Sequence, residues 1–128
     1  MKLTVQTTAK RDIVDITDQV AEVLKGDGVI HLFMQHTTAA LTTADLDPDT
    51  DLDYLDALTA MTPTGKWHHP HNPEHFPDHL WATIIGPDVS VPFHDGRLSL
   101  GSWQRIIVVE LDGPRSRQIE LSILKLAN

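Results

Sequence analysis

The beginning of the chain alternates between hydrophobic and polar positions in short runs. Residues 2–16 have the two-residue period of half-buried strands. In residues 17–25 the apolar positions change to helical spacing, Thr17 or Asp18 is a favourable N-cap, and Gly26 is a typical stop signal. We therefore expect extended strands followed by one short helix.

The central part predicts a pair of strands and a second helix. Residues 28–36 form a strongly apolar strand whose side chains alternate between two faces, and residues 39–43 are its expected partner. Asp47 can cap a helix, Pro48 suits the first helical position, and leucines recur every three residues from Leu52 onwards. This combination predicts a helix that has Asp47 as its N-cap, begins at Pro48 and carries one apolar stripe.

The last part predicts a third helix and four strands. After a loop interrupted by prolines, a helix should begin near Pro77 and end at Gly86. Four strand candidates follow, separated by turns, at residues 89–93, 96–101, 103–111 and 117–126. Strands interrupted by three helices, without regular alternation, indicate an α+β fold with mixed or antiparallel sheets. No linker divides the chain, so a single domain over residues 1–128 is expected.

The strand predicted at residues 103–111 differs from the others. Residues 106–109 are four consecutive apolar residues, IIVV, so both faces of this strand need a cover. In a domain of this size the second cover is a helix layer, a second sheet or another subunit. The sequence leaves these three alternatives open.

Composition excludes several classes of function. The net charge is −8, from 10 basic and 18 acidic residues, and the basic residues are scattered, so a nucleic-acid partner is not expected. No apolar run reaches the roughly 20 residues that span a membrane, and the N-terminus lacks the apolar segment of a signal peptide, so we expect a cytoplasmic protein. Because the chain has no cysteine, any metal ion must be bound by imidazole, carboxylate or water.

The most unusual feature is a histidine-rich loop at residues 66–79, KWHHPHNPEHFPDH. Its five histidines are His68, His69, His71, His75 and His79. A metal site, a proton-handling active site and a loop that only tolerates histidine are three alternative interpretations. Four-residue spacing would place His75 and His79 on one helical face, but Pro77 interrupts that helix, and the HExxH pattern is absent. We expect two of the five histidines to be functional.

A second candidate lies at the end of the predicted strand 28–36. His36 is well placed to act as an acid, a base or a metal ligand, and Thr37, Thr38 and Asp45 offer hydroxyls and a carboxylate nearby. The alternative is a buried histidine that only hydrogen-bonds to a neighbouring backbone group. The spacing of these residues does not choose between the two interpretations.

Two further pairs of residues suit contacts with a substrate. Trp103 could stack on a flat heterocycle while Gln104 hydrogen-bonds to its edge, or the two could be a core tryptophan and a turn glutamine. Arg115 and Arg117 suit a phosphate group, or they could lie at a solvated hairpin end. Neither a Walker loop nor a dinucleotide-binding fingerprint is present.

Taken together, these motifs resemble the YjbQ family, whose members are also described as secondary thiamine-phosphate synthases. The most specific pieces are HTTAALT at residues 36–42 and LGSWQ at residues 100–104. The other matching pieces, in chain order, are Asp47-Pro48-Asp49, a loop histidine followed by Pro77 and His79, Gly86, Pro92, Gly96-x-Leu98, Asp112-Gly113-Pro114-Arg115 and Arg117. Their order and spacing match over nearly the whole chain.

The resemblance implies a small α+β domain that assembles as a homotrimer, with sites near the subunit contacts. It also implies an activity that joins a hydroxymethylpyrimidine diphosphate to a thiazole phosphate and releases pyrophosphate. Magnesium is then the expected ion for the synthase chemistry, and zinc or nickel is the expected ion at the histidines. The alternative function is a non-catalytic homotrimer that binds a metal or a metabolite through a histidine site.

The chain departs from the family pattern at three points. An Ala-Asp pair at residues 44–45 stands where the family usually has Asn-Glu, the following loop is one residue shorter, and Trp81 takes the place of a common lysine. The family's first loop histidine aligns with His68 or His69. We favour His69, because Trp67 then takes the place of a tyrosine two residues earlier.

The candidate site combines the residues from both lines of reasoning. The expected catalytic residues are His36, Asp45, His69 and His79. The expected substrate-binding residues are Thr37, Thr38, Trp103, Gln104 and Arg115. The expected metal ligands are His36, His69 and His79, while Asp45 is assigned to magnesium or to a ring amine of the substrate.

Overall fold

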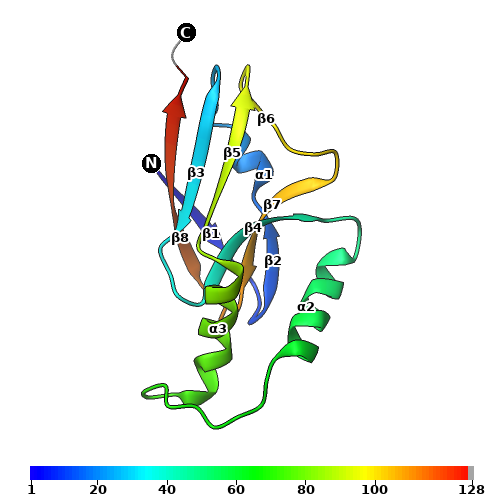
Figure 1. Ribbon diagram of the computed structural model, residues 1–128, viewed down its shortest axis with the longest axis vertical. Coiled ribbons are helices and arrows are strands. Elements are labelled where there is room, and N and C mark those ends of the chain that lie inside the picture. Colours follow the sequence, from blue (N-terminus) through cyan, green and yellow to red (C-terminus); the bar gives the residue numbers. More distant parts are fainter. Residues whose placement is uncertain (127–128) are drawn as a thin grey trace.

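The computed structural model describes residues 1–126 and consists of two antiparallel sheets with helices packed against them (Figure 1). The larger sheet has the strand order β1-β8-β3-β5-β6, and the smaller has the order β2-β7-β4. The strands are β1 (Lys2–Gln6), β2 (Asp12–Asp15), β3 (Gly28–Met34), β4 (Ala39–Asp45), β5 (Asp88–His94), β6 (Arg97–Leu98), β7 (Gln104–Glu110) and β8 (Ser116–Lys125). The helices are α1 (Thr17–Ala21), α2 (Thr50–Met61), the 3₁₀ turn η1 (Pro73–His75) and α3 (Phe76–Ile85). The predicted α+β class is confirmed.

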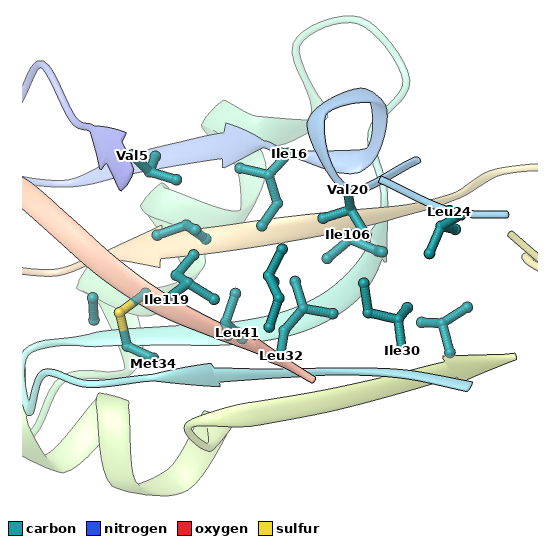
Figure 2. Close-up of a cluster of buried hydrophobic side chains, with 14 of the residues drawn as sticks. Val5, Ile16, Val20, Leu24, Ile30, Leu32, Met34, Leu41, Ile106 and Ile119 are labelled. Atoms are coloured by element: carbon teal, nitrogen blue, oxygen red, sulfur yellow. The ribbon is translucent and has the colours of Figure 1, made fainter. Parts of the chain in front are cut away.

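The main core lies between the two sheets (Figure 2). Ile106 and Val108 of β7 and Leu41 of β4 belong to one buried cluster with Ile30 and Leu32 of β3. Burying a side chain of this size stabilises a fold by about 1.5–3 kcal/mol relative to exposure. Because these residues alternate with outward-facing ones, the two-residue period read from the sequence selects the face that each strand buries.

Strand β7 is covered on both faces, as the IIVV run predicts. Ile107 and Val109 face away from the main core and form a second cluster with Trp81 and Ala82 of α3, against which Leu58 of α2 packs. The cover is therefore a second sheet on one face and a helix layer on the other. Figure 1 shows α3 and α2 on this side of the molecule.

Two strand predictions were wrong. Residues 39–43 were expected to pair with β3, but β4 pairs with β7 in the other sheet. The apolar pattern indicates which residues are buried, but it does not indicate which strand lies beside them. The loop after β3 leads the chain to the second sheet, and the pattern of β4 is compatible with either sheet. The strand expected at residues 96–101 is reduced to Arg97–Leu98.

The first helix differs from its prediction at both ends. It begins after Ile16, which makes no side-chain cap, and it ends at Ala21 rather than at Gly26. The hydroxyl of Thr17 donates instead to Asp15 Oδ1 at 2.6 Å and accepts the N–H of Ile106 at 2.8 Å. Thr17 therefore joins α1 to β7, and this long-range bond replaces the expected cap.

The second helix begins two residues later than predicted, with Asp49 rather than Asp47 at its N-cap. The N–H of Thr50 donates to the carbonyl of Asp47 at 2.9 Å, and Asp49 has a left-handed backbone with a φ of 69°. Pro48 is therefore the second residue of a type II turn, a position that its fixed φ also suits. No residue of α2 is fully buried, and Leu52 of its apolar stripe is 53% exposed. Within residues 1–126, no helix is long and apolar enough to cross a membrane.

The third helix agrees with its prediction. It runs from Phe76 to Ile85 with Pro77 in its first turn, and Gly86 follows with a φ of 107°. A positive φ of this size favours glycine, so Gly86 ends the helix and turns the chain into β5. The histidine-rich loop leads into this helix and brings its residues to one end of the sandwich (Figure 1).

Candidate functional site

The imidazole of His36 occupies the point where β3 separates from β8. His36 was expected to end the strand, but β3 ends at Met34, and His36 lies in the loop that follows. Its Nε2 accepts the backbone N–H of Gln118 at 2.8 Å. The side chain thus replaces a backbone carbonyl at the end of the β3–β8 ladder, which fixes the orientation of the ring.

This hydrogen bond determines the proton positions on His36. Because Nε2 accepts a hydrogen bond, the neutral ring carries its proton on Nδ1. Burial and the positive charges of Arg117 and Arg115 lower the pKa of His36 below its ordinary value, while Glu110 partly opposes them. The ring is therefore neutral at pH 7 and presents one N–H donor.

Below His36 lies a buried ion pair between Arg117 and Glu110, whose side chains are 1% and 0% exposed. The Nε–H of Arg117 donates to both carboxylate oxygens, at 2.9 and 3.1 Å, and Thr7 donates its hydroxyl to the same carboxylate at 2.7 Å. The Nη2 group of Arg117 also donates to the carbonyl of Thr38 at 3.1 Å and to its hydroxyl at 2.9 Å. Arg117 therefore anchors the residues that follow His36.

His36 and His79 line the same pocket. The pocket has a volume of about 430 Å³ and is lined by His36, Thr37, Ala39, His79, Ala82, Thr83 and Pro87. This volume is within the range of small-molecule sites. Helix α3 supplies His79, Ala82 and Thr83, and Pro87 follows that helix. His36 and Thr37 come from the loop before β4, and Ala39 is the first residue of β4. The structure thus brings together residues that are more than 40 positions apart in the chain.

His69 lies beside His79, as the preferred alignment anticipated. The two ring centroids are 4.6 Å apart, with an angle of 55° between the ring planes. His68 and His71 are exposed, and His75 lies 3.9 Å from a carboxylate oxygen of Asp112.

The arrangement does not form the three-histidine metal site that the sequence suggested. In the part of the chain that the structure describes, no group of three or more His, Asp or Glu side chains is placed to hold a metal ion. His36 cannot offer a lone pair through Nε2 while it accepts the Gln118 N–H, and its Nδ1 carries the proton. Only His69 and His79 remain as adjacent imidazoles, so metal binding stays a prediction.

Three of the predicted site residues lie elsewhere. Asp45 and Gln104 face each other where β4 pairs with β7, and Trp103 precedes Gln104 with 71% of its side chain exposed. The Gln104 side chain donates to Thr43 Oγ at 3.4 Å and accepts the N–H of Gly101 at 2.8 Å. The interpretation of Trp103 as a core residue is therefore excluded.

Asp45 is the one member of this second group with an unusual environment. Its Oδ1 is buried without a hydrogen-bond partner, and its carbonyl accepts the hydroxyl of Tyr54 at 2.9 Å. The pKa of the neighbouring Asp47 is raised above its ordinary value. The causes, in order of size, are loss of hydration, the negative charge of Asp45 and a hydrogen bond to Asp45. The carboxyl groups of Asp45 and Asp47 therefore interact with each other.

The two groups lie at opposite ends of β4. His36, Thr37 and Thr38 precede its first residue, Ala39, and Asp45 is its last. Six residue steps along a strand span about 20 Å. A single small substrate cannot contact both groups within one copy of the chain.

Arg115 belongs with the first group. Its charge lowers the pKa of His36, and its guanidinium donates to Asp112 at 2.8 and 3.2 Å. Sequence reasoning did not assign a role to Glu110 or to the backbone of Gln118. A glutamate that ends a continuous apolar run was the available signal for a buried ion pair, whereas no local pattern marks the Gln118 N–H.

Comparison with known families agrees with this architecture. The sequence model described as UPF0047 protein YjbQ-like matches residues 1–126. The chain belongs to the YjbQ/UPF0047 family. A UPF0047 relative from Archaeoglobus fulgidus is 37% identical over 126 residues, which cover 97% of this chain and 100% of the relative. The YugU protein of Bacillus subtilis is 31% identical, with 95% and 96% of the two chains covered.

Solved structures from the same family share the fold. A hypothetical protein from Aeropyrum pernix superimposes with a TM-score of 0.88 at 36% identity, covering 97% of this chain and 96% of that one. An uncharacterised member of the YjbQ/UPF0047 family from Clostridium acetobutylicum gives a TM-score of 0.87 at 31% identity, with 97% and 99% covered. Membership of the family is thus supported by sequence and by structure.

Proposed function

We propose that this protein is a cytoplasmic transferase of the thiamine-phosphate synthase type, which joins a hydroxymethylpyrimidine diphosphate to a thiazole phosphate. The observation that carries the proposal is the His36 pocket. It combines a neutral imidazole that has one N–H donor, the nearby positive charge of Arg115, and a volume of about 430 Å³, whereas the charge of Arg117 is paired with Glu110. Such a pocket suits the binding of an anionic group.

The chemistry requires stabilisation of a leaving group more than proton transfer. The bond between the methylene carbon and the diphosphate oxygen breaks, and its electron pair leaves with pyrophosphate. The thiazole nitrogen then donates its lone pair to the methylene carbon, forming the new C–N bond. Positive charges and N–H donors that face the leaving oxygens lower the barrier to the first step.

In this proposal each residue of the first group has a distinct part. His36 donates its Nδ1–H to a diphosphate oxygen, Arg115 contributes positive potential, and Thr37 adds a hydroxyl at the pocket wall. Arg117 acts indirectly, because it holds Thr38 and the start of β4 in place. His79 lines the pocket on the side of α3, and His69 lies beside His79.

Magnesium, which diphosphate chemistry of this kind uses, does not fit the residues of the His36 pocket. The first group offers imidazoles and cations, whereas magnesium prefers carboxylate and water oxygens. The carboxylates of Asp45 and Asp47 have suitable donors, but they lie at the other end of β4. No step of the proposed reaction is therefore assigned to a metal held by the first group.

A homotrimer would reconcile the two groups. In a cyclic trimer the contact between copies joins two different surfaces, so one copy can supply His36 and its neighbour Asp45, Trp103 and Gln104. We propose this arrangement for the complete site. Light scattering that gives a 14.3 kDa monomer at micromolar concentration would overturn it.

The activity is tested directly with the two precursors. Wild-type protein with magnesium should form thiamine phosphate, and His36→Ala should lower the rate at least tenfold, which is about 1.4 kcal/mol in the barrier. His71→Ala is the matched control, because His71 is exposed and lines neither pocket next to α3. A folded wild-type protein with no activity would contradict the synthase proposal.

Mixing two inactive variants tests whether copies share a site. His36→Ala and Asp45→Ala should each be inactive, and co-expression of the two should restore about one quarter of the wild-type rate, since a random neighbouring pair has both residues with that frequency in a cyclic assembly. If both residues acted within one copy, the mixed assembly would contain no complete site. Activity that stays at the level of the single variants would exclude the shared arrangement.

The alternative is a non-catalytic, metal-binding homotrimer, and the proximity of His69 and His79 favours it. One zinc or nickel ion per chain should then raise the melting temperature, since a ligand of the folded state adds stability. His69→Ala and His79→Ala should each abolish the shift, whereas His71→Ala should leave it intact. Equal losses in all three variants would indicate diffuse chelation and would reject the specific site.

A further inference from the structure

A second pocket adjoins the first on the histidine-rich loop. It has a volume of about 400 Å³, and the residues that line it are Trp67, His68, His69 and Phe76. Every one of these side chains is a flat ring. The Trp67 and Phe76 rings have centroids 4.8 Å apart with an angle of 42° between their planes. Flat rings offer faces and edges to another flat ring, and such contacts tolerate many substituents.

The two pockets share a wall. His69 lines the ring-lined pocket, His79 lines the His36 pocket, and their centroids are 4.6 Å apart. Helix α3 continues this wall, because Phe76, His79 and Thr83 have the three- and four-residue spacing of one helical face. From Phe76 to Thr83 the helix rises about 10 Å at 1.5 Å per residue.

The character of the wall changes along its length. At the Phe76 end it is lined by rings, and at the Thr83 end it is lined by hydroxyls and imidazoles near the positive charge of Arg115. A ligand that lies along α3 would therefore place a flat ring at one end and an anionic group at the other. The available length suits a six-membered ring joined through one methylene to a diphosphate.

We infer that the ring-lined pocket is the pyrimidine subsite, with the ring against Trp67 and Phe76 and the diphosphate beside His36. The inference rests on the proposed function and refines it, because the sequence had assigned ring contacts to Trp103 and Gln104. Within one copy, Trp103 lies directly before β7, at the Asp45 end of β4, which is about 20 Å from the His36 end along that strand. A ring one methylene away from the diphosphate cannot reach Trp103 of the same copy.

Calorimetric titration separates the two ring assignments. The probes are hydroxymethylpyrimidine diphosphate and inorganic pyrophosphate, which lacks the ring. Trp67→Leu should weaken binding of the pyrimidine probe at least tenfold, or about 1.4 kcal/mol, and leave pyrophosphate binding unchanged. Trp67→Phe, which keeps a flat ring, should retain affinity within threefold. Trp103→Leu tests the competing ring assignment, and His71→Ala, at an exposed residue that lines neither pocket, is the matched control with no expected effect.

Each other outcome overturns the inference in a recognisable way. Loss of pyrimidine binding in Trp103→Leu and not in Trp67→Leu would place the ring at Trp103 and leave the synthase proposal intact. Equal weakening of both probes in Trp67→Leu would show that Trp67 only shapes the neighbouring pocket. Wild-type protein that binds neither probe would reject the proposed function and, with it, the subsite.

Discussion

Among substitutions that remove a single charge, loss of one member of the buried Arg117–Glu110 pair should lower the free energy of unfolding most. Arg117→Met keeps the volume of the side chain and removes the cation, leaving a carboxylate that is 0% exposed. Removing one partner of a buried ion pair costs about 3–5 kcal/mol in other proteins. The hydrogen bonds from Thr7 and from the N–H groups of Leu111 and Asp112 to Glu110 remain, so we expect a value near 3 kcal/mol, at the lower limit of that range.

The pH dependence of this loss makes the prediction specific. Burial by itself opposes ionisation of Glu110, but hydrogen bonds from Arg117, Thr7 and Asp112 hold its pKa below the ordinary value. In the wild type this pair therefore stabilises the fold above about pH 4.5, the ordinary pKa of the carboxyl, and the contribution is lost as the pH falls through the lower folded pKa. In Arg117→Met, burial should instead raise the pKa of Glu110, so protonation relieves the unpaired charge.

Chemical denaturation at pH 7 and at pH 4.5 measures both effects. The difference in unfolding free energy between wild type and Arg117→Met should be largest at pH 7 and should shrink at pH 4.5. Adding Glu110→Leu to the variant should recover part of the stability, because it removes the buried charge that has no partner. A loss below about 1 kcal/mol at pH 7, or one that does not change with pH, would refute the account of the pair.

Three other predictions concern the residues around the sheets. His36→Gln keeps an acceptor for the Gln118 N–H and removes a ring whose pKa is lowered in the folded state. Below about pH 6.5 protonation of this ring favours the unfolded wild type, so the variant should lose less stability than the wild type in chemical denaturation. Ile107→Ala should cost about 2–5 kcal/mol, because the side chain is 2% exposed in the second cluster. Trp103→Ala should lower the unfolding free energy of the assembled protein by more than about 0.5 kcal/mol, because the ring is 71% exposed in one copy and the proposed trimer places it at the contact with a neighbour; a smaller loss would contradict that placement.

The local structure of this protein was predictable because its causes are local. Alternation over a few residues selects the buried face of β3, the IIVV run predicts the two-sided burial of β7, and Pro77 with Gly86 sets the limits of α3. The histidine loop and the HTT motif marked one end of the site. The start of α2 was misjudged because a proline after aspartate also suits a turn, and only the backbone of Asp49 distinguishes the two.

The assembly of the site was decided by contacts between distant residues. His36 meets a backbone N–H that is 82 positions away, and this contact sets its tautomer. Its burial and the charges of Arg117 and Arg115, which also come from a distant part of the chain, lower its pKa. The pairing of β4 with β7 places Gln104 opposite Asp45, while the extended backbone of β4 itself separates Asp45 from His36. Which strands pair depends on how the buried faces of the two sheets pack together. The apolar pattern of one strand is compatible with every strand that has a similar pattern, so it does not identify the partner. Which residues converge on one pocket therefore follows from the packing of the two sheets and α3, and no spacing along the chain encodes it.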